Sequence, residues 1–354
     1  MEKNGVFTDE CYFGASNSFY GFKNYFNTIF KQDEIDRLYV IKGGPGTGKS
    51  SFMKKVISEL SESSECEAIF CSSDPSSLDG VIIKHNQNSI AFLDGTAPHA
   101  TEAVIPGAWD ELIDLGKNWD SKWLIGSKEK IESLTKEKAA AYETAYSYLG
   151  IAGKCDSMTQ KFTTDPYICA ESKKMALKFC KDHVSVEEPI RNLRLVSSFG
   201  KYGKYSLDTL NTKGKKRIKL IGNHPAGELF LKDLKNALDT LEIGYTLFPT
   251  ALSPDIYESI YLPKNDVLIG FIDSDEVFDC DTLTAPAKLQ AERFKVANNL
   301  MDFALNEAQR WFSIASDLHF RLEEIYSAAM DFSKNDYIFT EKMKECKDIL
   351  GLSS

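Results

Sequence analysis

The chain of 354 residues contains the same pattern twice, and this repeat restricts the possible folds more than any other feature. The segment "RLYVIKGGPGTGKSSFMKKVISEL", which begins at Arg37, aligns with "RIKLIGNHPAGELFLKDLKNAL", which begins at Arg217. Further along, "DPSSLDGVII" matches "SPDIYESIYL", and "SIAFLDGT" matches "LIGFIDSD". Because matches in a constant order indicate duplicated structural units, we predict two similar units, at residues 1–187 and 188–354.

The first copy holds an apolar strand, a glycine-rich loop and a helix in that order. Residues 38–41 are apolar, Gly43, Gly48, Lys49 and Ser50 then satisfy the pattern GxxxxGK[ST], and a helical pattern follows. Glycines allow backbone N–H groups to approach phosphate oxygens that a Cβ would block. This context predicts an ATP-binding loop, with Lys49 on the β- and γ-phosphates and the Ser50 hydroxyl on Mg²⁺. The alternative is a glycine-rich turn that binds nothing.

A second magnesium ligand is expected at the end of the next buried strand. The apolar run at residues 90–93 predicts a parallel strand, and Asp94 ends it. Because the carboxyl ends of parallel strands meet at one edge of a sheet, we expect this carboxylate beside the loop. The alternative is an aspartate that only caps a turn.

Two further residues are candidates for catalysis. Asp74 follows the predicted strand "EAIFC" and could orient water or accept a proton, unless it only forms a turn with Pro75. Gly95 stands where many ATPases place a glutamate that polarises water. His99 could replace that glutamate, and a turn histidine without a catalytic part is the alternative.

Arginine is nearly absent from the first half, where Arg37 is the only one among the first 190 residues and precedes the strand. Charge on a transferred phosphoryl group is commonly stabilised by arginine. We therefore expect slow turnover, with any such arginine supplied by another chain or by the second half. The arginines of the second half are Arg191, Arg194, Arg217, Arg293, Arg310 and Arg321.

The second copy lacks the GK[ST] residues, so we expect its loop at residues 222–228 to be a degenerate nucleotide site. Each half also contains a long helical pattern, at residues 128–149 and 288–332, with apolar residues three and four apart. We expect α/β architecture, with two tandem three-layer units that each carry an inserted helical hairpin.

The composition excludes several classes of protein. A net charge of -10 argues against a general nucleic-acid binder, which needs an excess of basic residues. Eight cysteines without a CxxC pair indicate reduced thiols and no zinc or iron–sulfur site. No apolar run approaches the roughly 20 residues of a membrane span, and no signal peptide is recognisable at the N-terminus. We therefore expect a cytoplasmic protein.

The segments "KGGPGTGKSSFMKK", "FCSSDPSSLDGVII", "FLDGTAPH" and "PGAWDELIDLG" resemble an uncharacterised family of bacterial ATPase-like proteins built from two tandem P-loop NTPase halves. The resemblance covers nearly the whole chain and implies magnesium binding at Ser50 and Asp94. The chain departs from the family pattern in the second half, where "GNHPAGELF" stands in place of a second working loop. The nucleotide-binding residues that it implies are Gly43, Gly44, Pro45, Gly46, Thr47, Gly48, Lys49, Ser50 and Ser51.

Together these observations predict slow, magnesium-dependent ATP hydrolysis at the first half. ATP is favoured over GTP because no Asn-Lys-x-Asp motif follows the third predicted strand. Two alternatives stay open: a small-molecule kinase with Asp74 as base, and a switch in which bound ATP orders the helices for a protein partner. The sequence identifies neither the acceptor nor the partner.

Overall fold

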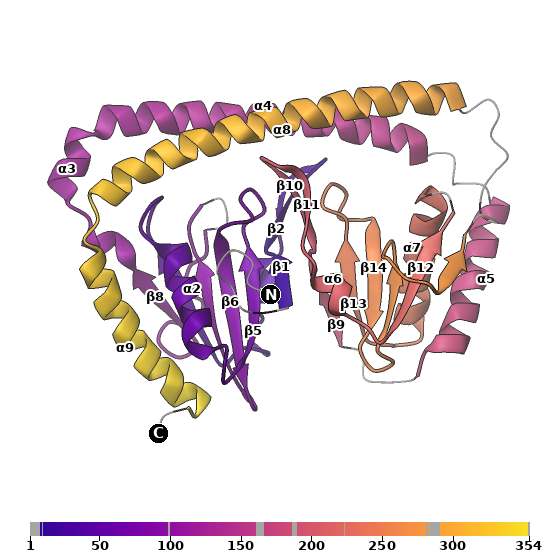
Figure 1. Cartoon of the computed structure of the whole chain (residues 1–354), viewed down its shortest axis with the longest axis horizontal. Helices are drawn as coiled ribbons and strands as arrows, with labels where there is room; N and C mark the ends of the chain where they lie inside the picture. Colours follow the sequence, from indigo (N-terminus) through magenta and orange to yellow (C-terminus); the bar gives the residue numbers. More distant parts are fainter. Residues whose placement is uncertain are drawn as a thin grey trace.

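The computed structural model describes residue 8 and residues 10–97, 100–160, 166–185, 190–222, 224–280, 283 and 291–352. Two mixed sheets of six strands stand beside each other, and two long helices run across both of them (Figure 1). The predicted α/β class with two units is therefore confirmed. We call the sheet formed within residues 10–114 the first sheet and the one formed within residues 191–279 the second sheet.

The two sheets have the same strand order. The first sheet contains, in spatial order, β1 (Glu10–Phe13), β5 (Glu65–Phe70), β6 (Leu78–His85), β7 (Asn88–Asp94), β4 (Arg37–Lys42) and β8 (Asp110–Asp114). The second contains β9 (Arg191–Leu193), β13 (Tyr245–Pro249), β14 (Tyr257–Leu262), β15 (Val267–Gly270), β12 (Lys216–Ile221) and β16 (Val277–Asp279). In each sheet the third strand of this order is antiparallel to both its neighbours, and the other pairs are parallel.

The smaller elements repeat in the same order. A two-stranded ribbon, a four-residue helix and the helix after the fifth strand of this spatial order occur once in each half. In the first half they are β2 (Ala15–Ser18), β3 (Gly21–Asn24), α1 (Phe26–Ile29) and α2 (Lys49–Leu60). In the second they are β10 (Ser197–Gly200), β11 (Gly203–Ser206), α6 (Thr209–Thr212) and α7 (His224–Thr240). The repeat seen in the sequence is thus a repeat of topology.

Strands β4 and β7 form the buried centre of the first sheet. Val40, Ile41 and Phe92 are fully buried, as expected for a parallel strand covered on both faces. The pairing is parallel and sets Ile41 opposite Asp94. The glycine-rich loop and the end of β7 therefore meet at one edge of the sheet.

The long helices correct the predicted hairpins. A 3₁₀ turn (Leu115–Asn118) and α3 (Ser121–Gly126) lead from β8 into α4 (Lys128–Gln160), and α4 packs along α8 (Ala291–Ala328) of the other half. Leu134 of α4 lies in one cluster with Leu322 of α8, and Ala145 lies in another with Ala308, so the helices are antiparallel. Their apolar residues recur at heptad spacing and include several alanines, which permit close approach. Each helix therefore finds its partner in the other half.

The last helix of each half packs on the opposite sheet. Helix α5 (Pro166–His183) lies against α7, where the rings of Phe179 and Phe230 are 6.1 Å apart. Helix α9 (Phe332–Leu350) lies against α2, where the rings of Phe339 and Phe52 are 5.2 Å apart. The predicted boundary between residues 187 and 188 separates the two sheets, but α5 and α9 each pack on the far side of it.

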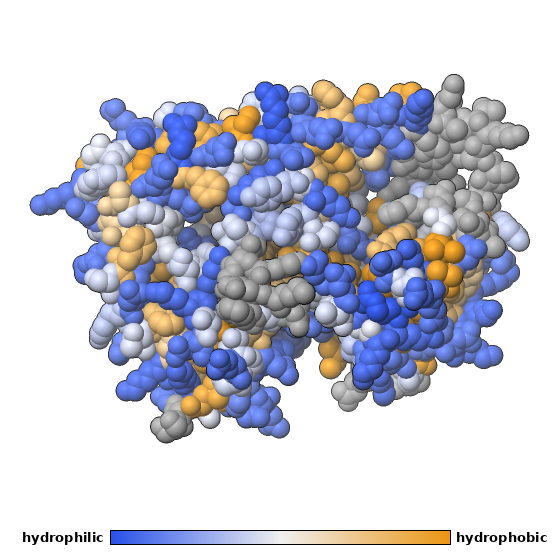
Figure 2. All heavy atoms as spheres, in the orientation of Figure 1, coloured by the Kyte–Doolittle hydropathy of each residue, from blue (hydrophilic) through white to orange (hydrophobic). Residues whose placement is uncertain are grey.

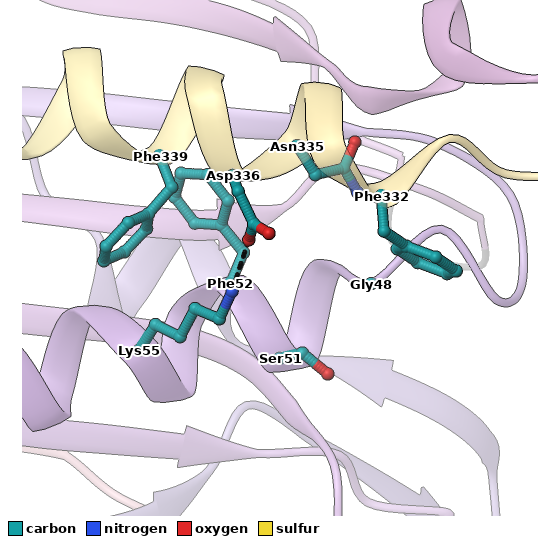
Figure 3. A pocket seen from close by; sticks show the side chains of 8 residues that line it. All are labelled: Gly48, Ser51, Phe52, Lys55, Phe332, Asn335, Asp336 and Phe339. Carbon is teal, nitrogen blue, oxygen red and sulfur yellow. Dashed lines mark hydrogen bonds and ion pairs between the residues drawn. The ribbon is translucent and has the colours of Figure 1, made fainter.

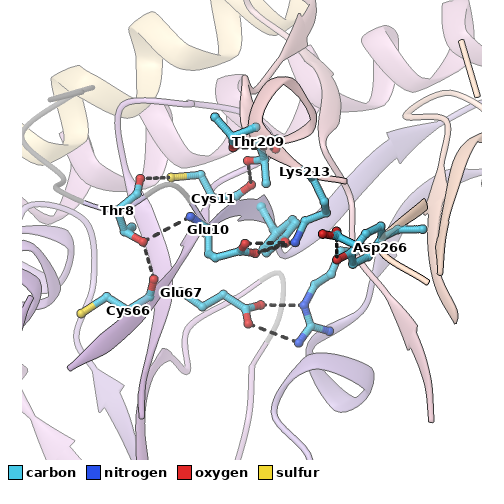
Figure 4. Close-up of polar contacts among 12 residues, drawn as sticks. Thr8, Glu10, Cys11, Cys66, Glu67, Thr209, Lys213 and Asp266 are labelled. Atoms are coloured by element: carbon cyan, nitrogen blue, oxygen red, sulfur yellow. Dashed lines mark hydrogen bonds and ion pairs between the residues drawn. The ribbon is translucent and has the colours of Figure 1, made fainter. Parts of the chain in front are cut away.

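Polar contacts also join the halves beside β1 (Figure 4). Lys213 Nζ lies 3.0 Å from a carboxylate oxygen of Glu10, and the Thr209 hydroxyl donates to the Cys11 carbonyl oxygen. Arg194 Nε donates to Glu67 at 2.6 Å, and both side chains are largely buried.

The visible face of the molecule is mostly hydrophilic, with separate small apolar areas (Figure 2). None of the helices in the described part of the chain combines the length and apolarity needed to span a membrane.

Candidate functional site

The glycine loop, residues 43–48, connects β4 to α2. Gly43, Gly46 and Gly48 have φ of 150°, 67° and 85°, in the region that side chains disfavour. Gly48 is also the N-cap of α2, so the helix begins directly at Lys49. The three glycines let the backbone turn sharply and direct α2 with its positive end at the loop.

Lys49 and Asp94 meet at this loop, as predicted. Lys49 Nζ donates hydrogen bonds of 2.9 Å to the carbonyl oxygens of Gly43 and Gly44. It also lies 3.6 Å from Asp94 Oδ2, and both side chains are mostly buried. The ammonium group therefore sits at the loop, beside one carboxylate.

Asp94 and Ser50 have further partners. Asp94 Oδ1 accepts hydrogen bonds from the backbone N–H and the hydroxyl of Thr96, so this residue also caps the turn after β7. The Ser50 hydroxyl accepts a hydrogen bond from the backbone N–H of Leu78 at 2.9 Å. Because a hydroxyl oxygen has two lone pairs, that contact leaves one for a cation.

Helices α8 and α9 of the second half cover the glycine loop, and the sequence analysis did not identify the residues involved. Ser327 Oγ donates to the Gly46 carbonyl at 3.0 Å, and Asn335 Nδ2 donates to the Thr47 carbonyl at 2.8 Å. Asn118 Nδ2 in turn donates to Asn335 Oδ1 at 2.8 Å. The second half therefore contributes to the site through amide and hydroxyl groups.

Trp119 closes the side of the loop next to Gly44. Its ring edge would lie 3.3 Å from a Cβ at that glycine, and its ring centroid is 5.3 Å from that of Tyr326 on α8. The indole Nε1 is buried and has no hydrogen-bond partner in the described part of the protein. A buried N–H without an acceptor costs about 1–3 kcal/mol, and the edge of the indole that faces Gly44 is that of its six-membered ring.

Asp74 lies in the turn after β5, and both its carboxylate oxygens are engaged. Oδ1 accepts from the backbone N–H and the hydroxyl of Ser76, and Oδ2 accepts from Lys201 Nζ at 2.8 Å. Burial opposes ionisation of Asp74, but the hydrogen bonds from Lys201 and Ser76 outweigh it and lower the pKa of the carboxyl below its ordinary value. The residue therefore forms a turn and an ion pair between the halves. His99 lies outside the described residues.

Four arginines of the second half have partners away from the glycine loop. Arg194 pairs with Glu67, Arg191 with Asp239, and Arg310 with Glu307. Arg217 donates to backbone carbonyls of its own half. Arg321 is exposed on α8. It is two residues from Glu323, whose backbone lies against Gly46 of the loop, and residues two apart do not share a helix face. The side chain of Arg293 lies outside the described part.

Most of the second copy of the loop is helical. Residues 222–228 were expected to form a degenerate site, but β12 ends at Ile221 and α7 begins at His224. Pro225 stands in its first turn, where a missing N–H costs no hydrogen bond. Asp273, which aligns with Asp94, is fully exposed and pairs with Lys219 at 3.2 Å. In the described residues of this stretch, helix therefore takes the place of the glycine loop of the first half.

Comparisons of the chain with protein-family models, with curated proteins and with solved structures give no match. The site is therefore interpreted from its own residues.

Proposed function

We propose that the first half binds ATP together with Mg²⁺ at the glycine loop and hydrolyses it slowly. The observation that carries this proposal is the meeting of the loop, Lys49 and Asp94 at one edge of the first sheet. The ammonium group of Lys49 would exchange the two loop carbonyls for phosphate oxygens, to which charge-assisted hydrogen bonds are stronger. Backbone N–H groups at the start of α2 would hold the phosphates.

Magnesium would be held by Ser50 and Asp94 together with phosphate oxygens. Both side chains offer oxygen, the ligand that this hard cation prefers. In the part of the chain that the structure describes, no group of three or more histidine, cysteine or acidic side chains could hold a metal. The cation would thus depend on the nucleotide for the rest of its ligands, and would supply charge stabilisation at the phosphates.

Slow turnover follows from the arginines, whose described side chains are engaged elsewhere or exposed on another helix face.

An ATP-gated switch is the second candidate, and the contacts of Ser327 and Asn335 with the loop favour it. Any change in the loop on nucleotide binding would act on the junction of α8 and α9. The kinase alternative has less support, because Lys201 and Ser76 occupy the carboxylate of its candidate base, Asp74.

The first experiment counts ADP and free phosphate released from ATP and Mg²⁺ by the purified protein and by two variants. Lys49→Ala should abolish release and weaken ATP binding at least about tenfold, as expected for lost charge-assisted hydrogen bonds. Lys219→Ala, which removes a lysine near the end of β12 in the second sheet, should leave both unchanged. Tight ATP binding without release would favour the switch, and ATP binding that survives Lys49→Ala would refute the assigned site.

A further inference from the structure

A cavity of about 260 Å³ lies between α2 and α9, next to the glycine loop (Figure 3). Its first wall is the face of α2 from Gly48 to Lys55, and its second is the face of α9 from Phe332 to Phe339. Nucleotide-sized ligands usually occupy pockets of about 300–1,000 Å³. This cavity therefore matches part of a nucleotide.

The position of the cavity relative to the loop indicates which part. Gly48 and Ser51 belong both to the start of α2 and to the wall of the cavity. Phosphates held by backbone N–H groups of the loop would end at this first turn of α2. The group attached to those phosphates would then lie against the cavity.

The aromatic side chains of the cavity are suited to a flat ring. The Phe332 ring lies 3.4 Å from the position of a Cβ at Gly48, yet 45% of this phenylalanine is exposed. Phe339 instead packs edge-on against Phe52, which also lines the cavity. An exposed aromatic face beside a glycine can stack on a nucleic-acid base.

A charged pair supplies polar groups between Phe332 and Phe339 (Figure 3). Lys55 Nζ and Asp336 Oδ1 are 2.5 Å apart, and both side chains are more than half exposed. An exposed ion pair contributes little stability, so opening it for a ligand is inexpensive. Asn335 is not available in this way, because its amide already bonds to Thr47 and Asn118.

We propose that this cavity receives the adenine of the ATP whose phosphates lie in the glycine loop, an inference that rests on the proposed function. Phe332 stacks on the ring, and the Asp336 carboxylate accepts a hydrogen bond from the exocyclic amino group. The first half thus holds the phosphates, while the last helix of the second half holds the base.

The test measures binding of ATP, inosine triphosphate and inorganic tripolyphosphate, each with Mg²⁺, to the full chain and its variants. Phe332→Ala should weaken ATP binding about fivefold or more, as stacking energies imply, and leave tripolyphosphate binding unchanged. Phe332→Trp should retain ATP binding. Phe303→Ala, which removes another exposed phenylalanine of the second half, is the matched control and should bind ATP normally.

Asp336→Ala should reduce ATP binding but not that of inosine triphosphate, which carries an oxygen in place of the amino group. Unchanged ATP binding in Phe332→Ala and in Asp336→Ala would overturn the base site alone. Loss of tripolyphosphate binding in Phe332→Ala would also overturn it, because the residue would then support the loop. If the unmodified protein bound neither ATP nor tripolyphosphate, the proposed function itself would fall.

Discussion

Gly46 has no room for a side chain, because α8 passes directly over it. A Cβ at this position would lie 2.5 Å from the backbone carbonyl oxygen of Glu323 and 2.5 Å from Ser327 Oγ. The residue also has φ of 67°. The glycine is therefore required twice, by its own backbone and by a helix from the other half.

Gly46→Ala should lower the free energy of unfolding, because the left-handed conformation alone costs alanine roughly 1–2 kcal/mol and the carbonyl cannot move without α8. Gly150→Ala is the matched control, since Gly150 lies inside α4 with open space around it. That change should stabilise the protein by about 0.5–1 kcal/mol. Thermal and urea unfolding measure the free energies of unfolding of the two variants. Equal values would show that α8 does not restrict the space at Gly46.

Residues of the candidate site differ in how far the sequence reveals them. Lys49, Ser50 and Asp94 belong to a local motif and to the end of an apolar strand, so they can be predicted from the neighbouring sequence. Ser327 and Asn335 lie 281 and 288 residues from their loop partners. Their place depends on the packing of whole helices, and a serine or asparagine in a helix carries no local signal of it.

At the scale of elements, the ribbon of β10 and β11 carries Lys201 to the end of β5. Lys201 Nζ bonds to Asp74 and lies 4.7 Å from the ring centroid of Phe320 on α8. Both members of the ion pair are less than a fifth exposed. The pair therefore fastens an element of the second half to the first sheet.

Lys201→Gln should lower the free energy of unfolding at pH 7 by about 1–3 kcal/mol. The pKa of Asp74 in the folded protein lies below its ordinary value of 3.8. Its stabilising effect is thus fully present above that pH and is lost as the pH falls through the folded value.

The difference in free energy of unfolding between the unmodified protein and Lys201→Gln should consequently shrink as the pH falls from 5 to 3. Urea unfolding at several pH values measures it. Lys204→Gln removes a half-exposed lysine from the same ribbon and should change little at any pH. A constant difference would mean that Lys201 acts through packing and not through the Asp74 charge.

Elements with strong local signals were predicted, and those that depend on partners were not. The helical period of the apolar residues predicted α4 and α8, but it did not predict which helix packs against which. Apolar faces of two helices in one chain can pair within a half or between the halves. Strand β6 was missed, although it lies between β5 and β7. Strand β8 gives only a weak pattern, since its two buried residues, Asp110 and Ile113, are three positions apart and Leu112 between them is exposed.

At the scale of the whole molecule, neither half is complete by itself. Residues 1–187 contain α5, whose buried Phe179 packs in the core of the second sheet. Residues 188–354 contain α9, whose buried Met343 packs in the core of the first. Each half would also expose the apolar seam of its long helix.

Co-expression of residues 1–187 with residues 188–354 should therefore yield a complex that purifies as one species and binds ATP like the intact chain. Either half alone should form aggregates or larger assemblies, because its exposed apolar surface has no other cover. Size-exclusion chromatography with light scattering distinguishes these outcomes. Two halves that stayed monomeric and folded separately would contradict the exchanged packing of α5 and α9.

The exchange of α5 and α9 is also the arrangement expected if this architecture evolved from a dimer of a single unit. A chain with only one of these units could bury its last helix only by lending it to a second copy, and the two copies would then form a symmetric dimer with two equal loops. Gene duplication and fusion of such a dimer gives the present topology without any new contact. Once the copies are joined, mutation can act on them separately, so one can keep its glycines while the other turns the same stretch into helix.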